Sequence, residues 1–348
     1  SVTFSPCCQQ GRPVWSAHRL GKTGMSVEIL LLENLAADAR QWLAARHHVD
    51  YRPELARDPQ ALRAHLYKTA ALVVPSWLRV GKPLLDCAPR LVAVGRIHEG
   101  GDNIDFEACQ RRSVRVVQAS SATARATAEY LLTALLTLFR TSGNLNVGAE
   151  PGDLQSPGRE INDSAIGLFG LSAPAQMLAP MLVALGARVL GYDPTLHRSA
   201  EIWTRLGVHP LSLAEMLETV DAVSMQTAYA SRYRGLVGER VLQSCKPGQL
   251  WVSASRAALF DLDALAQALR SGRLAACWMD SDDDLLAQPG CPVRGLPNLR
   301  ITPRLAPRTQ ESYLRGSWYL ADRLHQTLEM SAQQGGWKGT ATKPMPLG

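Results

Sequence analysis

The chain has 348 residues, of which 46% are hydrophobic and 20% are charged, and its formal net charge is +6. This length favours two domains, and the composition is that of a folded protein rather than a disordered one. The chain lacks an uninterrupted apolar stretch of roughly eighteen residues for a membrane span. It also lacks the apolar block and cleavage site of a secretory signal. We therefore expect a soluble cytoplasmic protein.

The seven cysteines and the excess of positive charge point to no particular chemistry. The cysteines are scattered without metal-ligand spacing, which is typical of buried or free thiols in a reducing compartment. The arginines are dispersed, and no aromatic-plus-basic motif accompanies them. We therefore do not expect nucleic acid to be a direct partner.

The first third of the chain alternates strands with helical segments. Residues 1–25 have no periodicity and predict a flexible N-terminal arm. A helical segment is expected at Leu35–Arg46, and strands are expected at Val27–Leu32, Ala71–Pro75, Leu91–Gly95 and Val114–Gln118. Such alternation predicts parallel strands with crossover helices. We assign residues 26–122, together with 305–332, to a flavodoxin-like lobe of the substrate-binding type.

The rest of the chain predicts a second α/β lobe. Thr123–Arg140 is apolar on more than one face, so its helix should be covered on several sides, between lobes or at a subunit interface. Residues 141–163 predict a linker or surface excursion, and residues 333–348 a disordered tail. Strands are expected at Ala165–Phe169, Arg188–Tyr192, Asp221–Gln226, Gln249–Ala254, Ala275–Met279 and Leu299–Thr302. Residues 123–304 thus predict a dinucleotide-binding Rossmann lobe. The whole chain predicts an α/β fold of two Rossmann/flavodoxin-like lobes, each a parallel sheet flanked by helices, with a cleft between them.

Several helix ends in this second lobe carry explicit signals. Ser212 and Glu215 have the spacing of a capping box. Asp261 is placed to cap the helix Leu262–Arg270, and Gly272 to end it. A helix is also expected at Pro174–Leu185, where Pro180 should introduce a kink.

The segment after the strand Ala165–Phe169 has the spacing of a nucleotide-binding loop. Gly170 stands at the first glycine position, but Ser172 and Ala175 replace the second and third. Asp193 follows the next strand, where an acid contacts the ribose hydroxyls. Ser172 adds a side chain where the backbone must approach a pyrophosphate, although its hydroxyl could donate to a phosphate.

Two interpretations of this loop stay open. It is either a weakened but usable nucleotide site or a Rossmann scaffold that no longer binds nucleotide. Asp193 favours retained binding, and NAD over NADP, because a 2′-phosphate would meet a negative charge.

Several motifs in register resemble those of one family. They are Val94–Ile97, Gly101–Asp105, Tyr192–Pro194, Lys246–Gly248, Arg256 and Pro297–Pro303. Together they resemble the D-isomer-specific 2-hydroxyacid dehydrogenases, a family that includes the C-terminal-binding-protein corepressors, over roughly Val27 to Leu328. The resemblance implies NAD as cofactor, a small 2-hydroxy or 2-keto acid as substrate, and a homodimer.

The resemblance also implies the site residues. Arg256 occupies the position of the arginine that fixes the substrate. Asp283 is the nearest match to the glutamate that holds the catalytic histidine protonated, with a register through residues 280–284 that is ambiguous by one residue. Asp280 matches an acid that contacts the nicotinamide amide. Thr227 and Ala254 complete the implied cofactor contacts.

The histidine position itself is occupied by Arg304. Transfer of a hydride to a carbonyl carbon leaves an alkoxide, which needs a proton donor with a pKa near the working pH. A guanidinium stays protonated and cannot cycle a proton. We expect Arg304 to be able to form an ion pair with Asp283.

The substrate loop departs from the family as well. It comprises Ser76, Ile97, His98, Glu99 and Gly100. His98 and Glu99 stand where the family has small residues, and Glu99 would repel an acid substrate if it pointed inward. Proline precedes Ser76 where the family often has an arginine. We interpret His98 as a loop residue rather than as a replacement acid–base group.

Two functions therefore remain. One is an NAD-dependent 2-hydroxyacid dehydrogenase with degraded catalytic residues and weak or lost turnover. The other is a non-catalytic nucleotide-sensing or scaffolding dimer of the corepressor type, whose plant members share these departures. The acidic run 280–284 is interpreted as a solvated loop, and no metal site is expected.

Overall fold

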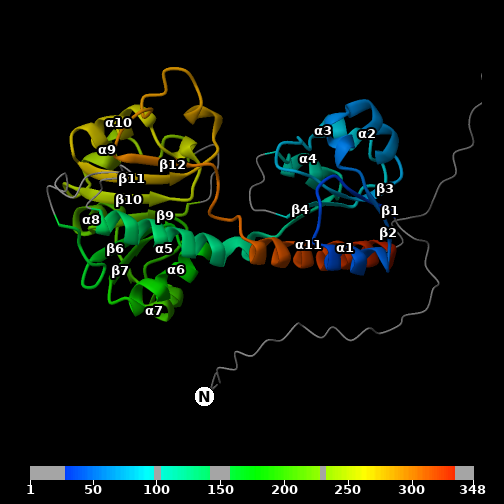
Figure 1. Ribbon diagram of the computed structural model, residues 1–348. Helices are drawn as coiled ribbons and strands as arrows, with labels where there is room; N and C mark the ends of the chain where they lie inside the picture. Colours follow the sequence, from blue (N-terminus) through cyan, green and yellow to red (C-terminus); the bar gives the residue numbers. More distant parts are fainter. Residues whose placement is uncertain (1–27, 98–102, 142–156, 228–232, 334–348) are drawn as a thin grey trace, which may run out of the picture.

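The computed structural model describes residues 28–97, 103–141, 157–227 and 233–333, and these form two α/β lobes (Figure 1). The predicted N-terminal arm, most of the predicted linker, and the predicted tail beyond residue 333 lie outside the described residues. So do His98, Glu99 and Gly100 of the predicted substrate loop.

The first lobe contains a five-stranded parallel sheet with the order β2-β1-β3-β4-β5. The strands are β1 (Glu28–Leu31), β2 (His48–Tyr51), β3 (Thr69–Val73), β4 (Ala93–Arg96) and β5 (Arg115–Gln118). Side chains alternate across the sheet, so that Ile29 and Leu31 enter one core and Leu30 the other. Helices α1 (Ala37–Ala44) and α11 (Gln310–Gln333) cover the first of these faces. The opposite face carries η1 (Pro53–Arg57), α2 (Pro59–Leu66), α3 (Lys82–Asp86) and α4 (Phe106–Arg111).

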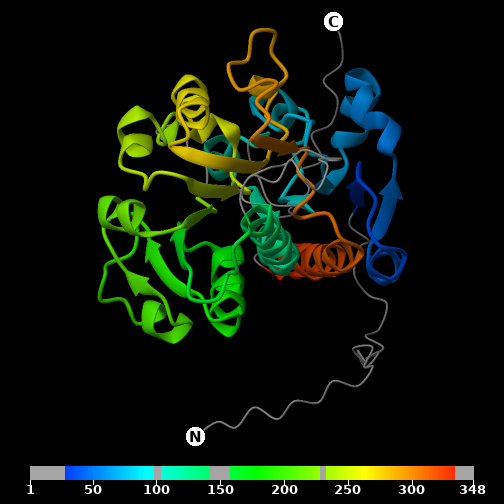
Figure 2. The same ribbon diagram turned by 60° about the vertical axis from the view of Figure 1, so that its left-hand side comes forward.

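The C-terminal helix α11 packs very closely on this first sheet. A Cβ atom at Gly95 of β4 would lie 2.5 Å from Cδ1 of Leu320, so a larger residue at this position would displace the Leu320 side chain. Helix α11 also contacts the segment that leads to the second lobe, because Nε of Arg315 donates to the carbonyl of Ala122 at 3.0 Å. Figures 1 and 2 show α11 beside the start of α5, the helix that leads into the second lobe. The exact lobe boundaries stay a prediction.

The second lobe contains a seven-stranded parallel sheet with the order β12-β11-β10-β9-β6-β7-β8. The strands are β6 (Ala165–Phe169), β7 (Arg188–Tyr192), β8 (His209–Pro210), β9 (Ala222–Met225), β10 (Gln249–Ser253), β11 (Leu274–Asp280) and β12 (Leu299–Thr302). The strand order reverses between β6 and β9, which is the switch point where doubly wound sheets bind ligands.

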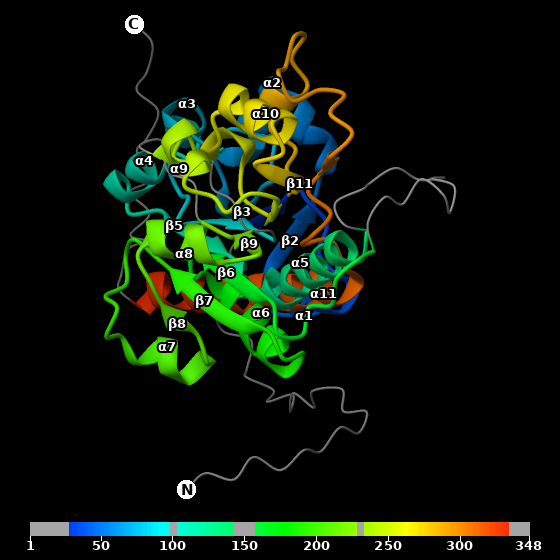
Figure 3. The same ribbon diagram turned by 90° about the vertical axis from the view of Figure 1, so that its left-hand side faces the viewer.

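Helices cover both faces of this sheet. On one face lie α5 (Ala124–Arg140), α6 (Ala173–Ala184) and α7 (Glu201–Leu206). On the other lie α8 (Leu213–Thr219), α9 (Glu239–Gln243) and α10 (Leu262–Arg270). Figure 3 shows α8 and α9 on the opposite side of the sheet from α6. The prediction of two parallel α/β lobes flanked by helices is confirmed.

The local helix signals also have clear outcomes. The capping box of Ser212 and Glu215 is present, and the side chain of Asp261 caps α10. Helix α6 continues through Pro180, whose missing N–H leaves the carbonyl of Gln176 without its usual helical donor. The short elements β2, β8, α7 and α9 were not predicted, since none is long enough to show a clear period.

Candidate functional site

The predicted nucleotide corner lies at the switch point between β6 and β9. Gly170 follows β6 and has φ +90°. A Cβ atom there would lie 2.8 Å from Oγ1 of Thr227, the residue that follows β9 by two positions. The Thr227 hydroxyl in turn donates to the carbonyl of Phe169 at 3.2 Å. The tight turn therefore needs glycine both for its backbone angle and for clearance.

Ser172 occupies the N-cap of the twelve-residue helix α6 without capping it. Its hydroxyl oxygen is buried and has no hydrogen-bond partner among the described residues. An unpaired buried hydroxyl at the positive end of a helix dipole fits an anionic ligand. Ala175, the third loop position, is fully buried and packs in the core below. The residues present thus fit a phosphate group at this corner.

Asp193 lies at the tip of β7, as the spacing predicted. Its Oδ2 accepts a hydrogen bond of 2.7 Å from the backbone N–H of Leu171. Its Oδ1 accepts from the backbone N–H and the hydroxyl of Thr195, at 2.8 and 2.6 Å. Oδ1 thus accepts two hydrogen bonds already, whereas Oδ2 has capacity for a further donor, such as a ribose hydroxyl.

Arg256 and Asp283 form an ion pair on the same lobe. Nε of Arg256 lies 3.3 Å from Oδ2 of Asp283, which is also within 3.2 Å of the backbone N–H of Ala258. The Asp283 side chain is 5% exposed, whereas that of Arg256 is 31% exposed. The structure therefore selects Asp283 from the acidic run as the partner of the substrate-position arginine.

Arg304 has a different partner from the one expected. Its Nη1 lies 3.7 Å from Oδ1 of Asp282, and the expected ion pair with Asp283 is wrong. The physical reason is that the Asp283 oxygens are already engaged by Arg256 and by the backbone N–H groups of Ala258 and Leu285. Arg304 also has φ +50°, a left-handed conformation that is uncommon for a residue other than glycine. The loop 280–284 nevertheless connects residues 256 and 304 through adjacent ion pairs.

Asp280 holds the turn that carries Arg304. Its Oδ1 accepts from the hydroxyl of Thr302 at 2.6 Å and from the N–H of Leu305 at 2.7 Å, and its Oδ2 accepts from the N–H of Ala306 at 2.8 Å. Asp280 is only 3% exposed. Asp280, which was predicted as a cofactor contact, thus has a structural role that the sequence did not reveal.

The Asp280 network extends into helix α5. The Thr302 hydroxyl is bonded to the Tyr130 hydroxyl, which accepts from Nε1 of Trp278 at 2.8 Å. The last cofactor residue predicted, Ala254, follows β10 and donates its N–H to the carbonyl of Met225 at 3.2 Å.

The first lobe places the predicted substrate segments at the carboxyl edge of its sheet. Ser76 is exposed after β3, and Ile97 is buried after β4. Asn103 bonds to two earlier segments of this lobe: its amide donates to the carbonyl of Leu78 at 2.6 Å, and its oxygen accepts from Nη1 of Arg96 at 2.7 Å. The residues on either side of the predicted substrate loop are therefore tied to each other.

Sequence reasoning missed Glu33 at this same edge. Glu33 follows β1, and burial raises the pKa of its carboxyl to about 7, against the opposing effect of the Arg96 charge. The available signal was its position directly after a buried strand, where polar groups of parallel sheets gather. Among the described residues there is no group of three or more side chains able to hold a metal ion. No described helix has the length and apolar character that a bilayer crossing requires.

The glycine corner, the acid at the tip of β7 and the strand order define a dinucleotide-binding protein of the Rossmann type. Residues 131–306 match the family described as D-isomer specific 2-hydroxyacid dehydrogenase, NAD binding domain. The chain therefore belongs to the D-isomer-specific 2-hydroxyacid dehydrogenase family. The prediction of NAD as cofactor is confirmed at the level of this domain.

Individual relatives support the assignment. The chain is 31% identical to the (S)-sulfolactate dehydrogenase of Chromohalobacter salexigens over 266 residues, which cover 75% of this chain and 85% of that protein. It is 31% identical to the D-3-phosphoglycerate dehydrogenase of Mycobacterium leprae over 277 residues, which cover 78% of this chain but only 51% of that protein. The chain thus spans about half the length of this second relative.

Solved structures show the same fold. A glyoxylate reductase from Paecilomyes thermophila has a TM-score of 0.75 at 19% identity, covering 88% of this chain and 96% of that one. The D-lactate dehydrogenase of Aquifex aeolicus, solved with NAD and lactic acid, has a TM-score of 0.73 at 20% identity, covering 91% of this chain and 100% of that one.

Proposed function

We propose that the protein binds NAD(H) at the corner formed by Gly170, Ser172 and Asp193 but turns over ordinary 2-hydroxy acids weakly or not at all. The observation that carries this proposal is the side chain at position 304. It is a guanidinium paired with Asp282, at the position that the resemblance assigns to the proton-transferring histidine of the family.

Several contacts support retained nucleotide binding. The partnerless Ser172 hydroxyl and the N-terminus of α6 would hold the pyrophosphate, and Asp193 would accept from the ribose hydroxyls. The same carboxylate would repel a 2′-phosphate, so NADH is preferred over NADPH. When bound, the nicotinamide supplies the hydride for reduction of a carbonyl.

The chemistry at residue 304 argues against ordinary turnover. A guanidinium keeps its proton at any physiological pH, so it cannot pass one to an alkoxide formed beside Arg256. Loss of a positioned acid–base group removes on the order of 10²–10⁴ in rate. The substrate carboxylate would also have to share Arg256 with the buried Asp283. If a small 2-keto acid binds, we therefore expect no rapid reduction of it.

The test combines binding with turnover. NADH binding is measured by calorimetry, and NADH oxidation is followed with a panel of 2-keto acids that includes sulfonate- and phosphate-bearing members. We expect micromolar NADH binding by the wild-type chain and negligible oxidation. Arg304→His should raise oxidation at least about tenfold, since it returns a group with a pKa near 6.5.

Arg304→Gln is the matched control, because it removes the same charge without supplying a proton donor. An equal gain in both variants would show that the charge, not the missing imidazole, limits the reaction. Rapid turnover by the wild-type chain, or no NADH binding at millimolar concentration, would refute the proposal.

A non-catalytic nucleotide-sensing homodimer is the second candidate function. The observation that favours it is a set of exposed apolar side chains on the packed helices α5 and α6: Leu136 is 42%, Met177 is 44% and Val183 is 43% exposed. Exposed apolar side chains mark subunit interfaces where they form one continuous patch. Sedimentation velocity with and without NADH tests it: a dimer strengthened by NADH supports sensing, and a monomer under both conditions refutes it.

A further inference from the structure

The first lobe contains a cavity that none of the candidate site residues lines. It has a volume of about 620 Å³ and lies between α2 and the segment that leads into α3. This volume falls in the range of roughly 300–1,000 Å³ that small-molecule sites occupy. Gly170, Arg256 and Arg304 belong to the other lobe. A ligand in this cavity would therefore be additional to any nucleotide or 2-keto acid.

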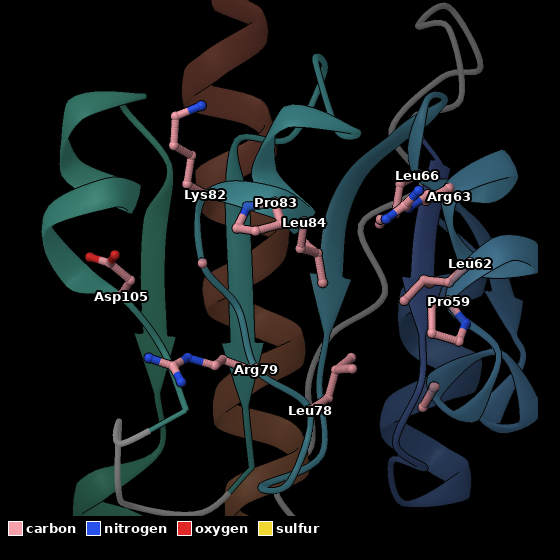
Figure 4. Close-up of a pocket in the computed structure, with 12 residues that line it drawn as sticks. Pro59, Leu62, Arg63, Leu66, Leu78, Arg79, Lys82, Pro83, Leu84 and Asp105 are labelled. Carbon is pink, nitrogen blue, oxygen red and sulfur yellow. The ribbon is translucent and has the colours of Figure 1, made fainter.

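Leucine side chains form the walls of this cavity. Figure 4 shows Leu62 and Leu66 of α2 on one side, with Leu78 and Leu84 on the side of α3. Leu62 and Leu66 are buried at the base, at 4% and 1% exposed, whereas Leu78 and Leu84 are half-buried. Such facing apolar walls stabilise a ligand with an aliphatic or aromatic body.

The charged side chains around these walls are mainly cationic. Arg63 extends from α2 beside Leu66, and Arg79 and Lys82 line the opposite side (Figure 4). Lys82 is paired with Asp86 at 2.8 Å. Arg63 and Arg79 form no ion pair or side-chain hydrogen bond with any described residue. These two guanidinium groups are therefore available to an anion.

One acid also lines the cavity and offsets part of this positive charge. Oδ1 of Asp105 caps α4 by accepting from the backbone N–H of Ala108 at 2.8 Å. The lining thus combines Arg63, Arg79 and a lysine that is paired with Asp86 with the single carboxylate of Asp105. The net field in the cavity favours a negatively charged group.

The chain's own outlying segments do not suit this cavity. Residues 1–27 and 334–348 contain arginine and lysine but neither aspartate nor glutamate. Both would be repelled by the arginines of the lining. Neither terminal segment therefore supplies the anionic group that this lining favours.

We propose that this cavity binds a small amphiphilic carboxylate, with its apolar body between the leucine walls and its carboxylate on Arg63. Arg79 adds to the attraction from the opposite side of the cavity. A medium-chain fatty acid has this chemistry, and sodium octanoate is a suitable probe.

The full chain is titrated with octanoate by calorimetry, with acetate and 1-octanol as comparison ligands. We expect saturable octanoate binding, no acetate binding in the same range because the apolar body is missing, and weaker 1-octanol binding because the charge is missing. Arg63→Gln should lower octanoate affinity about tenfold, the usual effect of removing one charge-assisted hydrogen bond. Equal affinity for octanoate and 1-octanol would overturn recognition of the carboxylate.

Two further variants locate the site. Arg115→Gln removes an equal charge from an exposed position on β5 outside the cavity and should leave the affinity unchanged. If it weakens binding as much as Arg63→Gln, only net charge matters and the proposal fails. If Arg256→Gln abolishes octanoate binding while Arg63→Gln does not, the ligand occupies the candidate active site instead, and the proposal is likewise overturned.

Discussion

The carboxylate of Asp193 accepts a hydrogen bond from the backbone N–H of Leu171, with an oxygen–nitrogen distance of 2.7 Å. This bond joins the tip of β7 directly to the turn after β6. The part of the site suited to a ribose is thereby fixed against the part suited to a phosphate before any ligand arrives. Such preorganisation lowers the ordering cost of binding.

Asp193→Asn should weaken NADH binding by about tenfold, because an amide accepts less strongly from Leu171 and from ribose hydroxyls than a carboxylate does. It should also narrow the preference for NADH over NADPH, since the repelling charge is gone. Calorimetric titrations with both nucleotides measure this. Unchanged affinity and unchanged preference would show that Asp193 does not face the ribose.

Gly170→Ala should destabilise the protein more than Gly248→Ala does. Gly248 has φ +74° and no atom within 4 Å of an added Cβ, so its replacement costs only backbone strain, about 1–2 kcal/mol. At Gly170 the added Cβ also meets Oγ1 of Thr227 at 2.8 Å, which adds about 1 kcal/mol or more. Urea unfolding of both variants measures the difference. Equal losses would mean that the turn relaxes freely.

Acidification should weaken the fold through His47. Burial, His325 and Arg46 lower the pKa of His47 from 6.5 to about 4. The folded state therefore prefers the neutral ring. The contribution of the neutral His47 ring to the free energy of unfolding is complete above pH 6.5 and is lost as the pH falls from 6.5 to 4. Because the ring is partly exposed, we expect a loss of only about 1 kcal/mol.

Unfolding free energies at pH 7.5 and 4.5 check this prediction, with His47→Gln as the variant that removes the titration. The structural basis is the contact of 2.9 Å between Nε2 of His47 and Nδ1 of His325, which two charged rings cannot keep. If the variant and the wild type show the same dependence on pH, His47 is not the group responsible.

Glu33 should weaken the fold as the pH rises rather than as it falls. Its pKa is raised from 4.5 to about 7, chiefly by burial. The folded state therefore prefers the protonated carboxyl, and its contribution is complete below pH 4.5 and lost as the pH rises through 7. Glu33→Gln keeps the shape and removes the charge. It should be about 1 kcal/mol more stable than the wild type at pH 8 and equal to it at pH 4.

Denaturant unfolding at both pH values tests the Glu33 prediction, and Glu107→Gln, at an 87% exposed side chain, is the control. A loss of stability for Glu33→Gln at pH 8 would show that attraction to Arg96 outweighs the cost of burying the carboxylate.

Local signals in the sequence were sufficient for much of the fold. The alternation of strands and helices predicted most strands of both sheets. The Ser212–Glu215 spacing located a helix start, because a capping box depends on four consecutive residues. Gly170 and Asp193 were found for the same reason, since strand, turn and acid follow each other at fixed spacing.

Interactions between distant segments were beyond the sequence. Arg304 pairs with Asp282 rather than Asp283 because Arg256 already holds Asp283, a competition that spacing alone does not show. The contact of His47 with His325 joins residues 278 positions apart. It depends on where α11 returns, and no local pattern encodes that.

The return of α11 to the first sheet has a consequence for biosynthesis. The hydrophobic face formed by Ile29, Leu31 and their neighbours is covered in part by Leu320 and Leu324, which leave the ribosome almost 300 residues later. During translation that face stays open to water while the second lobe is made. A nascent chain stalled before residue 310 would therefore expose an aggregation-prone hydrophobic surface and need a chaperone.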